Sequence, residues 1–373
     1  MRLISTKQLK PGDQLHDPVY NERGDTLIQR KIPLTVRMIQ RLIGMGISFV
    51  YVEDPATEDV VMVHPISKQT RRRAVQQIRT TFNGFEEEKL KKSFHLDEAV
   101  SDFTNIVRDI LSDLHKNKDA INLLSEVIGY DSYIFSHSVN VTIYSLALGL
   151  EMKMPQRRLE EIGLGAILHD IGKMYVPHQV LNKPGKLDEQ EFQTIKEHTT
   201  NGFQLLRSIP AIPLVAAHCA YQHHERLDGS GYPRGISSED IHQYGKLMAV
   251  TDVFDAVTSN RVYRQAMLPH EGMELLYSGA GTLFDSRVVE AFRRTVVLYP
   301  NGITIKLSDG TTGVVIRQNK GLTERPVVRI LEEAGRKIQH PYEVDLSKEL
   351  SLMVIECHTQ MKEDESAASL NTL

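Results

Sequence analysis

The sequence predicts a mainly α-helical protein with a small α+β module at one end and a small β-rich appendage at the other. Three observations lead to this fold class. Apolar residues recur at helical spacing through the middle of the chain, short strand-like runs surround one helix in residues 1–65, and strand alternation with glycine turns returns after residue 295. A chain of 373 residues is long enough for two or three domains.

Composition excludes several classes of protein. The net charge of −4 gives no overall attraction to a nucleic acid polymer or an anionic membrane, so an anionic ligand needs a local cluster of cations. No apolar run approaches the roughly 18 residues of a membrane span, and the N-terminal residues do not resemble a signal peptide. Cys219 and Cys357 are too few for a disulfide framework. We therefore expect a cytoplasmic protein without a membrane span.

Residues 1–65 are predicted to form a small α+β accessory or regulatory domain. "TVRMIQRLIGMG" indicates a helix that ends at glycine, and "ISFVYVED" is rich in the β-branched and aromatic residues of a strand. This stretch has no clustered ligands, so we expect regulation or dimerisation rather than chemistry.

Residues 66–119 are predicted to be a helical linker. The segment is charged, and no proline occurs between Pro65 and Pro155, which favours long amphipathic helices that would suit a homodimer. Its basic triplet, residues 71–73, is expected to lie on a solvated helix face rather than to bind nucleic acid.

The other end of the chain changes character again. Residues 296–360 include "GITIKLSDGTTGVVIRQN", whose alternation around a central Asp-Gly turn predicts a β-rich appendage. Residues 361–373 are polar and are expected to be a disordered tail.

Residues 120–295 are predicted to be a helical bundle that gathers metal ligands. The candidates stand on separate segments, and the gaps from 137 to 169, 169 to 198, 198 to 223 and 224 to 252 are 32, 29, 25 and 28 residues. Each gap accommodates a helix and a return connection, so antiparallel helices can bring all the ligands to one level of the bundle. The seven candidates are His137, His169, Asp170, His198, His223, His224 and Asp252.

Each candidate alone has an ordinary alternative, because a buried histidine is usually a hydrogen-bonded core residue and an aspartate is often a helix cap. Together, five imidazoles and two carboxylates suit iron, manganese, zinc or nickel. Seven ligands are too many for one catalytic ion with an open position. Two ions bridged by Asp170 would use them, and such a pair activates water for attack on a phosphoester.

Three segments resemble motifs of the HD-GYP family, a branch of the HD phosphohydrolases that hydrolyses cyclic di-GMP. They are "LHDIGK", "HHERLDGSGYP" and "TDVFDAVTSNRVYR". The resemblance covers residues 120–295 and implies an HD-type helical bundle. It implies two ligand sets that share Asp170 and hold a bridging hydroxide as nucleophile: His137, His169, Asp170 and Asp252 for one metal, and Asp170, His198, His223 and His224 for the other.

The same resemblance implies roles for residues around the metals. Lys173 would contact a phosphate and donate a proton to the leaving oxygen, and Asp255 would orient the attacking water. Arg261 and Arg264 would bind phosphate. The alternatives are an ordinary lysine at a helix end and two surface arginines.

His223 and His224 would close the second metal's ligand shell, and Gly229 and Gly231 in "DGSGYP" would let the chain turn sharply beyond it. Tyr232 is expected to stack on a substrate guanine, although a structural tyrosine is equally consistent with the sequence. The family also associates this loop with GGDEF-domain proteins, so such a protein is an expected partner.

One departure from the family pattern concerns the number of metals. Members with three metals have a glutamate four residues before the first histidine, and this chain has Tyr133 there. Because tyrosine is a poor bridging ligand, we expect two divalent ions, iron or manganese, with other transition metals also compatible.

The resulting hypothesis is a metal-dependent phosphodiesterase that hydrolyses cyclic di-GMP to pGpG, GMP or both. Three alternatives remain open from the sequence: hydrolysis of cyclic GMP-AMP, a catalytically silent cyclic-dinucleotide receptor, and a general HD nucleotidase. The last shares the His-Asp pair but does not account for the Gly-Tyr-Pro loop.

Overall fold

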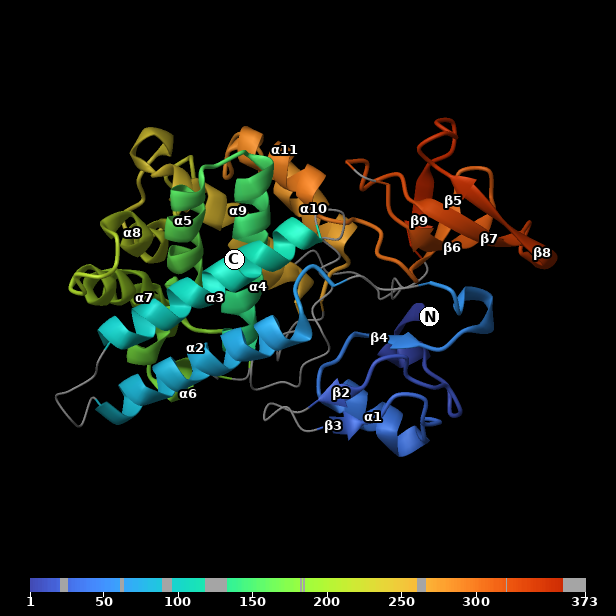
Figure 1. The fold of residues 1–373 in the computed structure, drawn as a ribbon, viewed down its shortest axis with the longest axis horizontal. Helices are drawn as coiled ribbons and strands as arrows, with labels where there is room; N and C mark the ends of the chain where they lie inside the picture. The colour runs from blue at the N-terminus through green and yellow to red at the C-terminus, as the bar shows by residue number, and fades with distance from the viewer. Residues whose placement is uncertain are drawn as a thin grey trace.

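The computed structural model describes residues 1–20, 26–60, 64–88, 96–117, 133–181, 183, 185–259, 266–319 and 321–357. Figure 1 shows a helical bundle beside two smaller bodies, a blue N-terminal module and a red C-terminal sheet. The predicted fold class, mainly α with a small module at each end, is confirmed. The expected tail lies outside the described residues. No helix in the described ranges is long and apolar enough to cross a membrane.

The N-terminal module is an α+β unit built on two short antiparallel strand pairs. Strand β1 (Arg2–Ser5) pairs antiparallel with β4 (Phe49–Val52), and β2 (Val19–Tyr20) pairs with β3 (Thr26–Ile28). Helix α1 (Val36–Gly44), the helix expected from the sequence, lies between β3 and β4 along the chain. Thr35 caps it, because its side chain accepts a hydrogen bond from the Met38 amide at 3.3 Å.

The residues predicted to form a helical linker are helical, and they pack on the bundle. Helices α2 (Lys68–Glu88) and α3 (Leu96–Lys116) lie side by side across one face of the bundle in Figure 1. Their buried residues Ile78, Phe103 and Ile110 belong to the same hydrophobic core as α4. An amphipathic helix is stable when its apolar face is buried, and α2 and α3 bury theirs against the bundle. The two helices are therefore a layer of the bundle rather than a spacer.

The centre of the bundle is formed by α4 (Tyr133–Glu151), α5 (Gln156–Leu168), α7 (Glu189–Arg207), α8 (Leu214–Gln222) and α9 (Gln243–Thr258). Shorter elements complete it: η4 (Ile171–Tyr175), α6 (His178–Leu181), η5 (Ser238–Asp240), α10 (Pro269–Ser278) and α11 (Ser286–Thr295). Residues 136–149 of α4 are all buried, so this helix is surrounded by the rest of the bundle on most sides.

Local signals set where these helices begin and how closely they approach. A capping box begins α7: the Asp188 carboxylate accepts from the Glu191 amide at 2.9 Å, and the Glu191 carboxylate accepts from the Asp188 amide at 2.8 Å. Gly172 in η4 lies against α7, where an added Cβ would overlap the carbonyl of His198 and approach the Gly202 nitrogen to 2.6 Å. Only glycine lets η4 and α7 meet here.

The C-terminal body is one antiparallel sheet of five strands in the order β8-β7-β6-β5-β9. The strands are β5 (Thr304–Leu307), β6 (Thr312–Arg317), β7 (Val327–Glu333), β8 (Arg336–Asp345) and β9 (Val354–Cys357). The Asp-Gly turn expected between β5 and β6 is present, with Gly310 at a φ of +87°. The predicted β-rich appendage is confirmed.

The two small bodies share a core, which the sequence did not suggest. Leu3 and Tyr51 of the N-terminal module are buried in the same cluster as Ile305 and Val328 of the sheet. The Leu3 amide also donates to the Gly302 carbonyl at 2.8 Å.

Candidate metal centre

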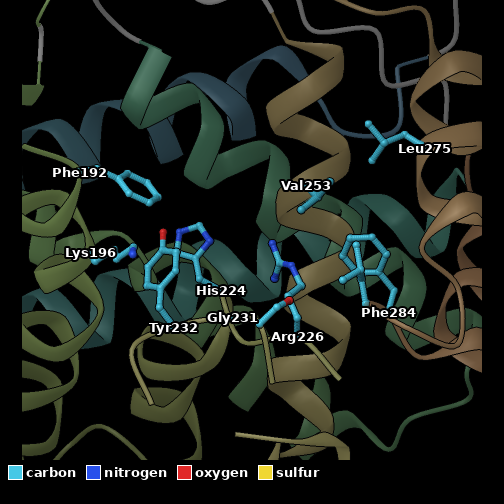
Figure 2. Close-up of a pocket in the computed structure, with 11 residues that line it drawn as sticks. Phe192, Lys196, His224, Arg226, Gly231, Tyr232, Val253, Leu275 and Phe284 are labelled. Carbon is cyan, nitrogen blue, oxygen red and sulfur yellow. The ribbon is translucent and has the colours of Figure 1, made fainter. Parts of the chain in front are cut away.

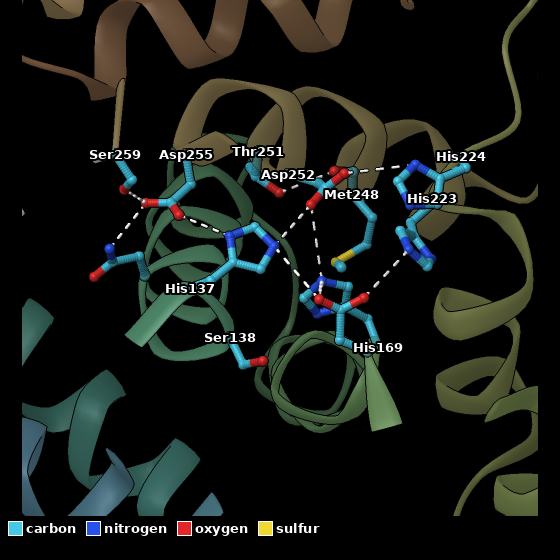
Figure 3. A network of polar contacts seen from close by, with 12 residues as sticks. His137, Ser138, His169, His223, His224, Met248, Thr251, Asp252, Asp255 and Ser259 are labelled. Carbon is cyan, nitrogen blue, oxygen red and sulfur yellow. Dashed lines mark hydrogen bonds and ion pairs between the residues drawn. The ribbon is translucent and has the colours of Figure 1, made fainter. Parts of the chain in front are cut away.

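The seven predicted ligands come from five parts of the bundle. His137 lies on α4, His198 on α7 and Asp252 on α9; the other four follow helix ends, namely His169 and Asp170 after α5 and His223 and His224 after α8. Figure 3 shows the side chains of His137, His169, His223, His224 and Asp252 converging on one region. All seven residues except His224 are buried, and its side chain is 16% exposed.

Asp170 divides the histidines into two groups. Its Oδ2 lies 3.7 Å from His137 Nε2 and 3.4 Å from His169 Nε2. Its Oδ1 lies 3.5 Å from His198 Nε2 and 3.9 Å from His223 Nε2. Each oxygen of one carboxylate therefore faces a different pair of imidazoles.

The two carboxylate oxygens of Asp252 also face different histidines. Its Oδ1 lies 3.0 Å from His137 Nε2 and 3.8 Å from His169 Nε2, while its Oδ2 lies 3.8 Å from His224 Nδ1. The sequence placed Asp252 with the first group alone. Its orientation toward His224 depends on how α9 rotates about its axis, which a motif does not specify.

The donor atoms fit divalent cations. Ligand atoms that each lie about 2 Å from one ion are about 3 to 3.5 Å apart, close to the spacings found here. His169 Nε2, Asp170 Oδ1 and His224 Nδ1 are buried without a hydrogen-bond partner in the described part of the chain. Leaving such atoms unsatisfied is costly, and a cation would satisfy them.

The ring orientation of three histidines is set by carbonyls of their own helices. The Nδ1 atoms of His169 and His198 lie 2.6 Å from the carbonyls of Ala166 and Ile195, and that of His223 lies 3.0 Å from the Cys219 carbonyl. Because a carbonyl oxygen only accepts, each Nδ1 carries the hydrogen. The Nε2 lone pairs are left for metal.

Burial and charge prepare the ligands for a cation. Burial lowers the pKa of His198 to about 4 and also lowers the pKa values of His169, His223 and His224. Burial alone would raise the pKa of Asp170, but Lys173 and the surrounding histidines outweigh it and hold that pKa well below its usual value. At neutral pH these groups are in the protonation state that metal binding requires.

His137 is held differently, through a carboxylate. Its Nδ1 donates to Asp255 Oδ2 at 2.7 Å, and Asp255 Oδ1 accepts from Asn140 Nδ2 at 2.9 Å and Ser259 Oγ at 3.0 Å. Burial would lower the pKa of His137, yet the hydrogen bonds to Asp252 and Asp255 raise it to about 9. Asp255 thus contacts the ring edge that faces away from the other ligands, whereas the resemblance implied contact with water.

Lys173 lies beside the shared carboxylate. Its Nζ is 2.5 Å from Asp170 Oδ2, and its side chain is 21% exposed. This distance puts the Lys173 ammonium group next to the carboxylate that both histidine groups face.

A cavity of about 390 Å³ opens next to His224 (Figure 2). Sequence reasoning identified Tyr232 among its lining but missed Phe192, Lys196, Arg226 and Phe284. Phe192 and Lys196 stand four residues apart on α7, so a helical face leading to His198 was the available signal. The cavity combines aromatic rings with two cations.

The Gly-Tyr-Pro loop folds back onto the histidine pair. The Tyr232 amide donates to the His224 carbonyl at 3.1 Å, and the two rings stack with centroids 4.6 Å apart at 25°. Gly229 has a φ of +81°, and an added Cβ on Gly231 would come within 2.5 Å of the same carbonyl. Both glycines are therefore required, one by its backbone angle and the other by close approach.

Some expected residues lie outside the described part. Arg261 and Arg264 fall in a gap between residues 259 and 266. Tyr133 is the first residue of α4, and its side chain is not described.

Comparison with known proteins agrees with this site. A family model described as an HD domain matches residues 105–288. Just under half of the chain is therefore similar to an HD domain. The His-Asp pair and the Gly-Tyr-Pro loop that carry the resemblance to the HD-GYP branch lie within the matched residues. A second model, a KOW domain associated with HD domains, matches residues 304–365 and covers the five-stranded sheet.

The chain is 34% identical over 241 residues to the cyclic di-GMP phosphodiesterase PA4108 of Pseudomonas aeruginosa, across 65% of this chain and 58% of the relative. It is 31% identical over 172 residues to the 3'3'-cGAMP-specific phosphodiesterase 3 of Vibrio cholerae, across 46% and 37%. A solved structure of Bd1817, an HDG"Y"P protein from Bdellovibrio bacteriovorus, covers 78% of this chain and 97% of that one, with 17% identity and a TM-score of 0.46. The chain spans about half the length of the curated relatives it matches.

Proposed function

We propose that this chain is a metal-dependent phosphodiesterase that hydrolyses cyclic di-GMP to pGpG, GMP or both. One observation carries the proposal: a single carboxylate, Asp170, directs one oxygen to each of two histidine groups. The adjacent cavity supports a dinucleotide substrate, because its rings can stack on bases and its cations can pair with phosphates.

We assign the ligands to two cations that share Asp170: His137, His169, Asp170 and Asp252 for one, and Asp170, His198, His223 and His224 for the other. When bound, two such cations lower the pKa of water and polarise a phosphodiester. Iron and manganese suit imidazole and carboxylate donors without thiolates.

The surrounding side chains would then act on the substrate. Once a cation shares Asp170, the Lys173 ammonium is available to a phosphate oxygen and can pass a proton to the leaving oxygen. The stacked ring of Tyr232 offers a face for a guanine, and Phe192 lies near it with ring centroids 6.3 Å apart. Arg261 and Arg264 are proposed as further phosphate contacts from the resemblance alone. A GGDEF-domain partner and a homodimer remain predictions.

A second substrate, cyclic GMP-AMP, is favoured by one observation. A relative 31% identical over 172 residues is described as a 3'3'-cGAMP-specific phosphodiesterase. The two substrates differ in one base, so they would present the same phosphates to the metal centre and differ only in the cavity.

The test is hydrolysis by protein purified without oxygen and loaded with Fe²⁺ or Mn²⁺. We expect faster loss of cyclic di-GMP than of cyclic GMP-AMP, with pGpG or GMP identified by chromatography. The double variant His169→Ala with Asp170→Ala should lose turnover. Tight binding of either nucleotide without turnover by the fully loaded protein would favour a silent receptor, and no interaction with either would defeat the proposal.

A further inference from the structure

A buried line of polar groups runs from α2 to the metal centre. Arg71 Nη2 donates to Asn140 Oδ1 at 2.8 Å, and Asn140 Nδ2 donates to Asp255 Oδ1 at 2.9 Å. Asp255 Oδ2 then accepts from His137 Nδ1 at 2.7 Å. The line joins helices α2, α4 and α9 and ends on a predicted metal ligand.

Arg71 is an unusual member of its helix. It is 5% exposed, whereas its neighbours Arg72 and Arg73 are exposed. The expectation of a solvated face for the whole triplet is therefore wrong at Arg71, because this residue points from α2 into the bundle. Its Nη1 is buried without a hydrogen-bond partner in the described ranges. Burying a guanidinium costs free energy unless hydrogen bonds or an opposite charge compensate for the lost water. The hydrogen bond to Asn140 gives part of that compensation.

The chemistry of the groups gives the line a direction. A guanidinium can only donate, so the amide oxygen of Asn140 must face Arg71. The amide nitrogen is thereby turned toward Asp255, which can only accept while it is ionised. Asp255 is in turn oriented so that its other oxygen meets His137 Nδ1 and keeps the hydrogen on that nitrogen. Each link fixes the next one.

We propose that Arg71 is a positioning residue that orients His137 toward the metal through Asn140 and Asp255. The matched HD domain begins at residue 105, so Arg71 lies outside it. The helix that carries Arg71 follows the N-terminal module, with Ser67 accepting from the Arg71 amide at 3.0 Å in its first turn. The seating of α2 on the bundle therefore affects one ligand of the centre.

The line reaches only one of the two ligand groups. His198 and His223 are oriented by carbonyls of their own helices, and the hydrogen bonds that start at Arg71 lead to His137 instead. Breaking the line should weaken the group that contains His137 and His169 and spare the group of His198, His223 and His224. This selectivity distinguishes positioning from a general loss of structure.

The experiment is a Mn²⁺ titration of metal-free full-length protein in two backgrounds. His198→Ala leaves the His137 group as the main site, and His169→Ala leaves the His198 group. Arg71→Met is added to each, and free Mn²⁺ is followed by electron paramagnetic resonance. We expect about a tenfold loss of affinity in the first background, as is typical when a residue that supports a metal ligand is removed, and no change in the second.

Matched variants separate the causes. Arg72→Met alters the exposed neighbour and should change neither affinity. Arg71→Lys keeps the charge with fewer donors and should recover part of the loss. If Arg71→Met does not fold, as judged by circular dichroism, Asn140→Leu breaks the line at its middle and should show the same selectivity.

An equal loss in both backgrounds, or no loss in either, in a folded variant overturns the inference. The inference rests on the metal centre of the proposed function and not on the substrate. Absence of Mn²⁺ binding by the unmutated protein would defeat the proposed function, whereas normal binding that ignores Arg71 would defeat the inference alone.

Discussion

At the scale of single residues, the arrangement depends on Asp170. Its two oxygens face different histidine pairs at 3.4 to 3.9 Å, so one substitution affects both. Asp170→Asn removes the charge that both cations would share. We expect metal content to fall for both groups and the rate of hydrolysis to drop by at least about a hundredfold. Substituting a residue that only supports a metal ligand already lowers metal affinity or activity by about 10–100-fold.

Elemental analysis and rate measurements on the same preparation check this expectation. Asp240→Asn is a suitable control, because Asp240 is an exposed aspartate of the same domain. A fully metallated Asp170→Asn protein would mean that the carboxylate is not a shared ligand.

Tyr232 offers a second test at this scale. Its ring stacks on His224 and lines the cavity, so Tyr232→Leu removes a face on which a base can stack. Stacking is worth about 1 kcal/mol, which predicts a decrease of several-fold to tenfold in kcat/KM for cyclic di-GMP. Tyr232→Phe keeps the ring and should retain most of the activity. Equal losses in the two variants would show that the hydroxyl, and not the ring, matters.

At the scale of elements, the contact between η4 and α7 brings Asp170 to His198. Gly172 has no room for a Cβ, which would overlap the His198 carbonyl. Gly172→Ala should force the two elements apart, destabilise the fold by about 1–3 kcal/mol and weaken metal binding by the His198 group. Thermal unfolding and metal titration measure the two effects.

Gly44→Ala is the matched control, because an added Cβ there meets no atom within 4 Å and α1 lies far from the site in Figure 1. It should leave metal binding unchanged and stability equal or slightly higher. Metal binding that survives Gly172→Ala would show that α7 can shift without moving His198.

The helices that hold the ligands could be expected from the sequence, because their evidence is local. Apolar stripes, the capping box of Asp188 and Glu191, and ligand gaps of one helix plus a return all lie within short stretches. The contact of Arg71 with Asn140 joins residues 69 positions apart, and nothing in either helix alone indicates it. Arg71 was misjudged because a basic triplet on an amphipathic helix is usually solvated.

At the scale of the whole molecule, the N-terminal module and the C-terminal sheet pack against each other. They share a core, and Arg329 joins them, with Nη1 and Nη2 at 2.6 and 2.7 Å from the two oxygens of Asp59 and Nη2 at 2.9 Å from Glu343. The sequence predicted both units but not their contact, because a strand's alternation shows that one face is buried and not what covers it.

This ion pair predicts a pH dependence. The hydrogen bond from Arg329 lowers the pKa of Asp59 from 3.8 to about 2. A carboxyl whose folded pKa is below its unfolded value stabilises the fold above pH 3.8, and that contribution is lost as the pH falls through about 2. Because the Asp59 side chain is 65% exposed, we expect a contribution of about 1 kcal/mol or less.

Thermal unfolding of the unmutated protein and Arg329→Met across pH 2 to 7 tests this. The difference in Tm should be constant above about pH 4 and narrow toward pH 2. Lys337→Met, at an exposed position of β8, should show no such trend. A difference that does not change with pH would assign the effect of Arg329→Met to lost packing.

The metal centre is expected to hold two cations on opposite sides of the Asp170 carboxylate. An anomalous-scattering map from crystals of the full chain grown with Mn²⁺ tests it most directly. Two peaks are expected, one among His137, His169 and Asp252 and the other among His198, His223 and His224, each beside a different oxygen of Asp170. A single peak, or none between these side chains, would contradict it.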